Sequence, residues 1–297
     1  MHKHRLDRQY VPYMFLMPAL LASIVIVLVP IVYAISLSFM NYNLARPSEI
    51  GFVGIANYRN VWRDEVFLIS FRNTFVWILG VILLQLILGF ITAIILNMHF
   101  RFRGVIRAMI LIPWVTPSVI TGLLWRWMYD GNSGVINDLL VRARIIDRFV
   151  PWLAQSSTAM IAIMVALMWQ GFPFFAIMIL AGLQAIQQEL YEVADVDGAT
   201  TWQKFAKITL PLLLPILLTT ILLRTIWVAN SLDIIFIMTG GGPGYNSYTL
   251  ALYSYIKAYR GLDFGYAGAI AVYLTLLILV VVIIYVIRIT KKDESIQ

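Results

Sequence analysis

The chain has 297 residues, of which 61% are hydrophobic and only 12% charged, and it contains no cysteine. This composition excludes a water-exposed globular protein, disulfide bonds, and catalysis or metal binding by cysteine. A net charge of +7 would suggest nucleic-acid binding in a soluble protein, but in a membrane protein it indicates basic cytoplasmic segments. We therefore expect an all-α integral membrane protein.

Long apolar stretches mark membrane spans, because a helix needs about 20 residues to cross the hydrocarbon core. Six such stretches are expected, at about 11–39, 73–97, 105–125, 158–181, 210–238 and 264–287. The basic start of the chain continues into the first stretch without a small-residue cleavage pattern, so we interpret it as a retained span. An even number of spans places both termini on one side. Lys and Arg are denser in segments 1–11, 98–107, 184–207 and 288–297, which favours cytoplasmic termini.

The segment between the fourth and fifth expected spans predicts two short helices with a sharp break. Gly198 permits a tight turn, and Thr200 with Gln203 forms a capping box that restarts a helix. Trp202 and Phe205 then lie on an apolar stripe that suits a membrane surface or the groove of a partner. From the stripe alone, a plain interfacial helix joining two spans is the simpler interpretation.

The complete pattern of this segment resembles the EAA loop of binding-protein-dependent ABC importer permeases. The matching residues are Glu192-x-Ala194, then Asp197-Gly198-Ala199 and, nine residues further on, Ile208-x-Leu210-Pro211. Segments 180–186, 239–243 and 265–269 resemble the carbohydrate-uptake branch of that family, and within it the MalF/UgpA-type subunit. One departure is Gln187, where the branch usually has proline, and it affects the expected geometry at the start of the loop.

The resemblance implies a type I ABC importer permease fold of six transmembrane helices. It implies one permease domain over residues 1–297, with a core at about 73–290 and the EAA coupling loop at about 184–210. The loop would bind a cytoplasmic ATPase. The coupling residues it implies are Glu192, Ala194, Asp197, Gly198, Ala199, Trp202 and Phe205.

The resemblance also implies the setting in which the chain works. The implied partners are a second homologous permease, two ABC ATPase subunits, a periplasmic or lipid-anchored solute-binding protein and a sugar-like solute. The location is the bacterial inner membrane, with both termini in the cytoplasm. The chain itself would be non-catalytic and hold no cofactor, with ATP and magnesium bound by the ATPase subunits.

Polar residues in the fifth span are candidates for solute contacts, because polar groups inside a membrane need partners. At 100° per residue, Trp227, Asn230 and Asp233 share one side of a straight helix. Indole, amide and carboxylate groups together suit a polyhydroxylated ligand. The alternative is that Asn230 and Asp233 only bind neighbouring helices. Arg224, in the cytoplasmic half of the span, is expected to snorkel to the membrane surface.

Two further spans hold candidates of the same kind. Trp169, Gln170 and Phe174 surround a kink expected at Pro173 in the fourth span. Tyr273 is a candidate in the sixth span, although a single tyrosine there also suits packing.

Other functions find little support in the sequence. The glycine-rich segment 239–244 lacks the Lys-Ser/Thr that ends a P-loop, and the three histidines have no clustered carboxylates, so neither nucleotide nor metal binding is expected. A secondary transporter or channel acting alone is the alternative class, but it usually shows internal repeats or chains of intramembrane charges. A membrane-embedded enzyme would need clustered acidic, His or Ser groups. Neither alternative explains the EAA loop.

Overall fold

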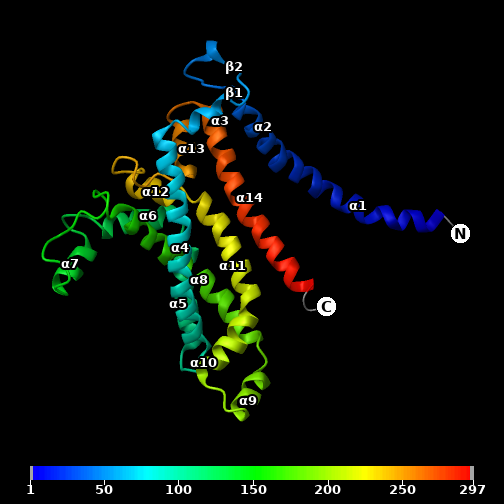
Figure 1. Ribbon diagram of the computed structural model, residues 1–297, viewed down its shortest axis with the longest axis vertical. Helices are drawn as coiled ribbons and strands as arrows, with labels where there is room; N and C mark the ends of the chain where they lie inside the picture. The colour runs from blue at the N-terminus through cyan, green and yellow to red at the C-terminus, as the bar shows by residue number, and fades with distance from the viewer. Residues whose placement is uncertain (1–2, 295–297) are drawn as a thin grey trace. The chain divides into compact units, whose positions relative to one another are not determined.

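The fold is known from a computed structural model that describes residues 3–294, with side chains described for residues 13–287 (Figure 1). The chain divides into two compact units. One contains the residues up to Asp64 together with Ser254–Tyr273, and the other contains Glu65–Tyr253 together with the residues from Leu274 onward. Helix α14 (Phe264–Glu294) begins in the first unit and continues into the second.

The first unit begins with a long apolar helix and continues into a small hairpin. Its elements before α14 are α1 (Lys3–Ser23), η1 (Ile24–Leu28), α2 (Val29–Ser38), β1 (Met40–Asn41), η2 (Pro47–Glu49), β2 (Gly51–Phe52), α3 (Ala56–Val61) and the later part of α13 (Leu250–Tyr259). Strands β1 and β2 pair antiparallel, a small addition to an otherwise helical fold. Gly265 lets the start of α14 approach the hairpin, because a Cβ there would lie 2.1 Å from the carbonyl oxygen of Met40.

The second unit contains the remaining helices. They are α4 (Glu65–Asn97), α5 (Arg103–Val115), α6 (Ser118–Met128), α7 (Val135–Arg142), α8 (Ala159–Ala185), α9 (Gln188–Val196), α10 (Thr201–Lys204), η3 (Phe205–Thr209), α11 (Leu210–Asn230) and α12 (Asp233–Thr239). Helices α4, α8 and α11 pack against one another, and α9 and α10 lie together at one end of them (Figure 1).

The contact between α4 and α8 is close enough to require glycine. A Cβ on Gly89 would lie 2.4 Å from the Cβ of Phe175 and 3.0 Å from the carbonyl oxygen of Phe172. Small residues at a helix interface let two backbones approach closely. The resulting van der Waals contacts help to hold helices together inside a membrane. The side chain of Trp77 adds a bond from α4 to α11, donating from Nε1 to the carbonyl oxygen of Val228 at 3.0 Å.

The described residues include five helices long and apolar enough to cross a membrane, or six if the bent pair α5 and α6 is one span. Five of the six predicted spans are therefore found as single helices, and the third, expected as a straight helix at 105–125, corresponds to the bent pair. Its two helices meet at 94°. Thr116 and Pro117 are extended at the break, with ψ of 124° and 140°, because proline disfavours the helical conformation in the residue before it.

The fifth span also differs from the prediction of one helix over 210–238. The helical segment starts earlier, at Thr201, and ends at Asn230. Ser231 is extended, with ψ of 100°, and a separate helix begins at Asp233. The second helix of the EAA loop is thus continuous with the fifth span, and the assumption of one straight helix through Asp233 was wrong.

Candidate solute cavity and coupling loop

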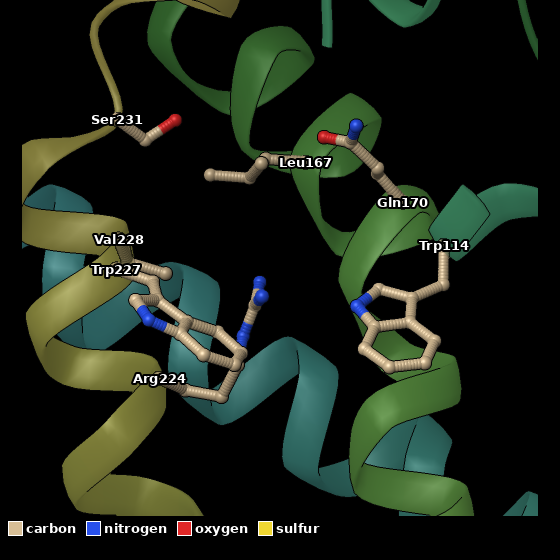
Figure 2. A pocket seen from close by; sticks show the side chains of 7 residues that line it. All are labelled: Trp114, Leu167, Gln170, Arg224, Trp227, Val228 and Ser231. Carbon is tan, nitrogen blue, oxygen red and sulfur yellow. The ribbon is translucent and has the colours of Figure 1, made fainter. Parts of the chain in front are cut away.

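A cavity of about 240 Å³ lies among the packed helices of the second unit. Its lining residues come from α5, α8, α11 and the break after α11. They are Trp114, Leu167, Gln170, Arg224, Trp227, Val228 and Ser231 (Figure 2). Two indoles, a guanidinium, an amide and a hydroxyl therefore surround one space, and these groups can stack on a ring and bond its polar substituents.

Arg224 is the charged group of the cavity and is only 7% exposed. Its Nε donates a hydrogen bond of 2.9 Å to Oε1 of Gln85 on α4. Gln85 is fully buried and in turn donates from Nε2 to the carbonyl oxygen of Leu167 on α8 at 2.7 Å. The expectation that Arg224 snorkels was wrong, since it turns into the helix bundle, where a polar partner holds it.

The position of this pair depends on a glycine in α8. A Cβ on Gly171 would lie 2.1 Å from Nε2 of Gln85 and 2.2 Å from Nη2 of Arg224. Both side chains would have to move if any other residue stood there. Helix α8 also continues through Pro173.

The indoles of the cavity are joined by a phenylalanine. The ring centroid of Phe174 lies 5.7 Å from that of Trp114 and 5.1 Å from that of Trp227. Phe174 is buried and is not among the lining residues, so it packs against both indoles without lining the cavity itself. Gln170 is oriented by a bond of 2.8 Å from its Nε2 to the carbonyl oxygen of Thr116, at the break between α5 and α6.

The structure brings only some of the predicted solute candidates together. Gln170 and Trp227 line the cavity. Trp169 instead packs edge-on against Trp125, with ring centroids 6.0 Å apart. Tyr273 belongs to the first unit, where it accepts a hydrogen bond of 2.8 Å from Trp62.

Asn230 and Asp233 do not share a helix face and do not line the cavity. Asn230 is exposed and donates to the carbonyl oxygen of Ile226 in its own helix at 2.8 Å. Asp233 begins α12 and accepts a hydrogen bond of 3.2 Å from Ser118 at the start of α6. The Asp233 bond matches the alternative interpretation, in which these residues bind neighbouring helices, whereas Asn230 bonds only within its own helix.

Several residues that line the cavity or bond to its lining were not predicted, and the signals for them differ. Arg224 was visible as a charge in an apolar span, a feature that by default marks a functional site. Gln85 was visible as the one amide within the second expected span, 73–97, apart from its terminal residues. Trp114 and Ser231 gave no such signal, because only the breaks in the third and fifth spans direct them into the cavity.

The coupling loop has the local geometry that its sequence predicts. Gly198 adopts a left-handed φ of 72° directly after α9. Thr200 and Gln203 form the predicted capping box, with bonds of 3.3 Å and 2.7 Å. Lys204 bonds Asp195 at 2.6 Å, which ties the second helix back to the first.

Most of the predicted coupling residues face outward. Glu192, Asp197, Gly198 and Trp202 are exposed, whereas Ala194, Ala199 and Phe205 are half-buried. Trp202 is 72% exposed, and Phe205 lies edge-on to Phe90 of α4. At the base of the loop, the hydroxyls of Tyr191 and Thr209 are 2.8 Å apart. The loop is thus anchored to the bundle and leaves an exposed tip with both acidic and apolar groups.

A membrane-spanning bundle around a polar and aromatic cavity, with an exposed helix–turn–helix loop, defines a transport permease. The chain belongs to the family of binding-protein-dependent transport system inner membrane components, which it matches over residues 85–291.

Named relatives and solved structures agree with this family. The chain is 36% identical to the trehalose/maltose transport system permease MalF of Thermococcus litoralis, covering 92% of this chain and 91% of the relative. It is 35% identical to the sulfoquinovosyl glycerol transport system permease SmoG of Agrobacterium fabrum, covering 94% and 90%. The fold is similar to a chain of a bacterial ABC transporter that imports the acidic polysaccharide alginate, with a TM-score of 0.81, 21% identity and coverage of 95% and 96%.

Proposed function

We propose that this chain is the solute-conducting permease subunit of an ATP-driven importer for a sugar or sugar-like solute. It pairs with a second homologous permease and contacts two ATPase subunits. A solute-binding protein delivers the solute from outside. The observation that carries the proposal is the exposed, glycine-turned EAA loop, because a transporter acting alone has no need of such a surface.

The sugar class is supported by the relatives and by the cavity. The relatives are named as trehalose/maltose and sulfoquinovosyl glycerol permeases. One similar structure is an alginate transporter in complex with an alginate-bound periplasmic protein. Indole faces beside hydrogen-bonding groups, as in the cavity of this chain, suit a sugar ring.

In this proposal the chain performs no catalysis and binds no cofactor. ATP and magnesium are bound and used by the ATPase subunits, and their closure shifts the two permeases between inward-open and outward-open states. The denser basic residues of the segments around the EAA loop and the termini support a cytoplasmic location for all of them.

The coupling role can be tested with Glu192→Lys in the assembled importer. The variant should insert and assemble but lose solute uptake, because a reversed charge on the exposed loop opposes docking of the ATPase. Glu49→Lys, a charge reversal in an exposed hairpin, is the matched control and should transport normally. Normal uptake by the Glu192 variant would contradict the coupling assignment.

The orientation can be tested with single cysteines, since the natural chain has none. In intact spheroplasts, Gly244→Cys should react with an impermeant thiol reagent and Thr201→Cys should not. The opposite labelling pattern would place the EAA loop outside the cell and overturn the proposal.

A further inference from the structure

The cavity contains a buried cation that has no acidic partner. Arg224 is only 7% exposed, and none of the ion pairs among the described residues includes it. A buried charge without a counter-charge is strongly unfavourable unless hydrogen bonds compensate it. Such a group in a membrane bundle calls for a functional explanation.

Gln85 fixes the guanidinium without neutralising it. The Nε2 of Gln85 donates to Leu167, so its Oε1 is turned toward Arg224 and accepts from Nε. Among the described residues, the two Nη groups of Arg224 have no hydrogen-bond acceptor in the protein. Figure 2 shows the guanidinium extending into the space between the indoles of Trp227 and Trp114.

The surroundings of the guanidinium are built to hold it there. Gly171 leaves the room that Nη2 occupies, since a Cβ would come within 2.2 Å of it. The Trp227 ring lies 5.7 Å from Cζ of Arg224, a distance at which an aromatic face attracts a cation. Guanidinium, amide and indole are therefore preorganised before any ligand arrives.

The remaining lining limits what can enter. Ser231 offers a hydroxyl at the cavity wall, and Trp114 offers a second indole opposite Trp227. The volume of about 240 Å³ is below the range of about 300–1,000 Å³ usual for drug-sized ligands. The cavity thus suits one ring with its substituents.

We propose that Arg224 is the specificity-determining contact of this permease, binding a pair of solute oxygens through its two Nη groups while the ring stacks on indole. Gln85 is a positioning residue that acts through Arg224. A guanidinium presents two parallel N–H donors, so the matching ligand feature is either two neighbouring hydroxyls or one acidic group. This inference rests on the proposed function and narrows it to the chemistry of one residue.

The test is equilibrium binding to the intact importer in lipid nanodiscs. The probes are methyl glycosides of glucose, galactose and mannose, each paired with the methyl glycuronide that differs only in its carboxylate. Wild type should bind at least one pair. Arg224→Gln should weaken binding of the best probe about 10- to 100-fold, as expected for lost bonds to a charged donor. The control Arg142→Gln removes an equal charge from an exposed side chain and should leave binding unchanged.

The paired probes distinguish the two ligand features. A wild-type preference for the glycuronide that disappears in Arg224→Gln identifies an acidic group. If wild type binds the glycoside and the glycuronide equally, and Arg224→Gln weakens both to the same degree, the ligand feature is a pair of neighbouring hydroxyls. The proposal is overturned if Arg224→Gln, corrected for assembled complex, binds the best probe as tightly as wild type, or if wild type binds no probe. In those cases wild-type uptake and its loss in Glu192→Lys would still support the proposed function, which is therefore tested separately from the role of Arg224.

Two more variants separate binding from folding. Arg224→Lys keeps the charge but not the paired donors, so it should assemble and still bind the probe less tightly. Gln85→Leu should lose affinity as Arg224→Gln does, because it removes the acceptor for Nε of Arg224. If all these variants bind the probe as tightly as wild type per assembled complex, Arg224 and Gln85 contribute only to packing.

Discussion

The EAA loop and the candidate solute cavity belong to the same unit, yet the sequence predicted the loop well and the cavity poorly. The loop is specified by neighbours within a few residues: Gly198 turns the chain and Thr200 restarts the helix. The cavity is specified by residues far apart in the chain, such as Gln85, Leu167 and Arg224. A local device can be inferred from spacing, whereas a site shared by several helices depends on where each helix breaks.

If the loop is a local device, damaging it should stop transport without disturbing the bundle. Gly198→Pro should abolish uptake, because proline requires a φ near −65° and lacks the N–H that Gly198 donates to Asp195. Uptake assays with quantification of assembled complex would show this. Gly54→Pro, at another left-handed glycine, between β2 and α3 in the first unit, is the control, and comparable loss in both variants would indicate misfolding instead.

Damage to the bundle should have the opposite signature. Gly89→Leu should sharply reduce the amount of assembled complex, because the new side chain collides with the Cβ of Phe175 and the carbonyl oxygen of Phe172 in α8. Detergent-extracted protein and its melting temperature would measure the loss. Gly104→Leu, where a Cβ meets nothing within 4 Å, should be tolerated. Normal stability of Gly89→Leu would mean that the α4–α8 contact is looser than described.

Asp233 gives a sharper comparison, because the sequence suggests a ligand and the structure shows a helix contact. Asp233→Ala and Ser118→Ala should each cost about 0.5–1.5 kcal/mol of stability, and the double variant little more, since both remove the same bond. Uptake per assembled complex should stay near wild type. A specific loss of uptake with Asp233→Ala, absent in Ser118→Ala, would restore Asp233 as a solute contact.

The capping box of the loop should have a similarly small effect. Thr200→Ala removes the side-chain acceptor for the Gln203 amide and should destabilise the start of the helix by about 1 kcal/mol. Hydrogen exchange at residues 201–204 should accelerate about five-fold, with partial loss of uptake. Thr200→Ser keeps the acceptor and should behave as wild type. Equal exchange in Thr200→Ala would show that the ATPase or the membrane, and not the cap, orders this turn.

The smallest effect is expected in the loop after α6, where a local turn depends on pH. Hydrogen bonds from the backbone N–H groups of Asn132 and Ser133, and from the Ser133 hydroxyl, lower the pKa of Asp130. This stabilisation is present above the unfolded pKa of about 4 and is lost as pH falls through the lower folded value. Amide protection at residues 132 and 133 should therefore fall in acid, and Asp130→Asn should lessen that dependence. Amide protection at residues 132 and 133 that does not change as the pH is lowered would contradict this prediction.

The sequence by itself determined the membrane-spanning class, the approximate spans and the geometry of the EAA loop. Each depends on composition or on residues within one or two helical turns, where apolar length, a left-handed glycine and a cap act directly. Only the tertiary structure decided which polar residues meet. Thr116-Pro117 and Ser231 break two spans that hydropathy alone joins, because hydropathy records burial in lipid and not the direction of the chain. Those breaks place Trp114 and Ser231 at the cavity and remove Asp233 from it. Gly171 makes room for the Arg224 guanidinium, which the sequence alone suggested would lie at the membrane surface.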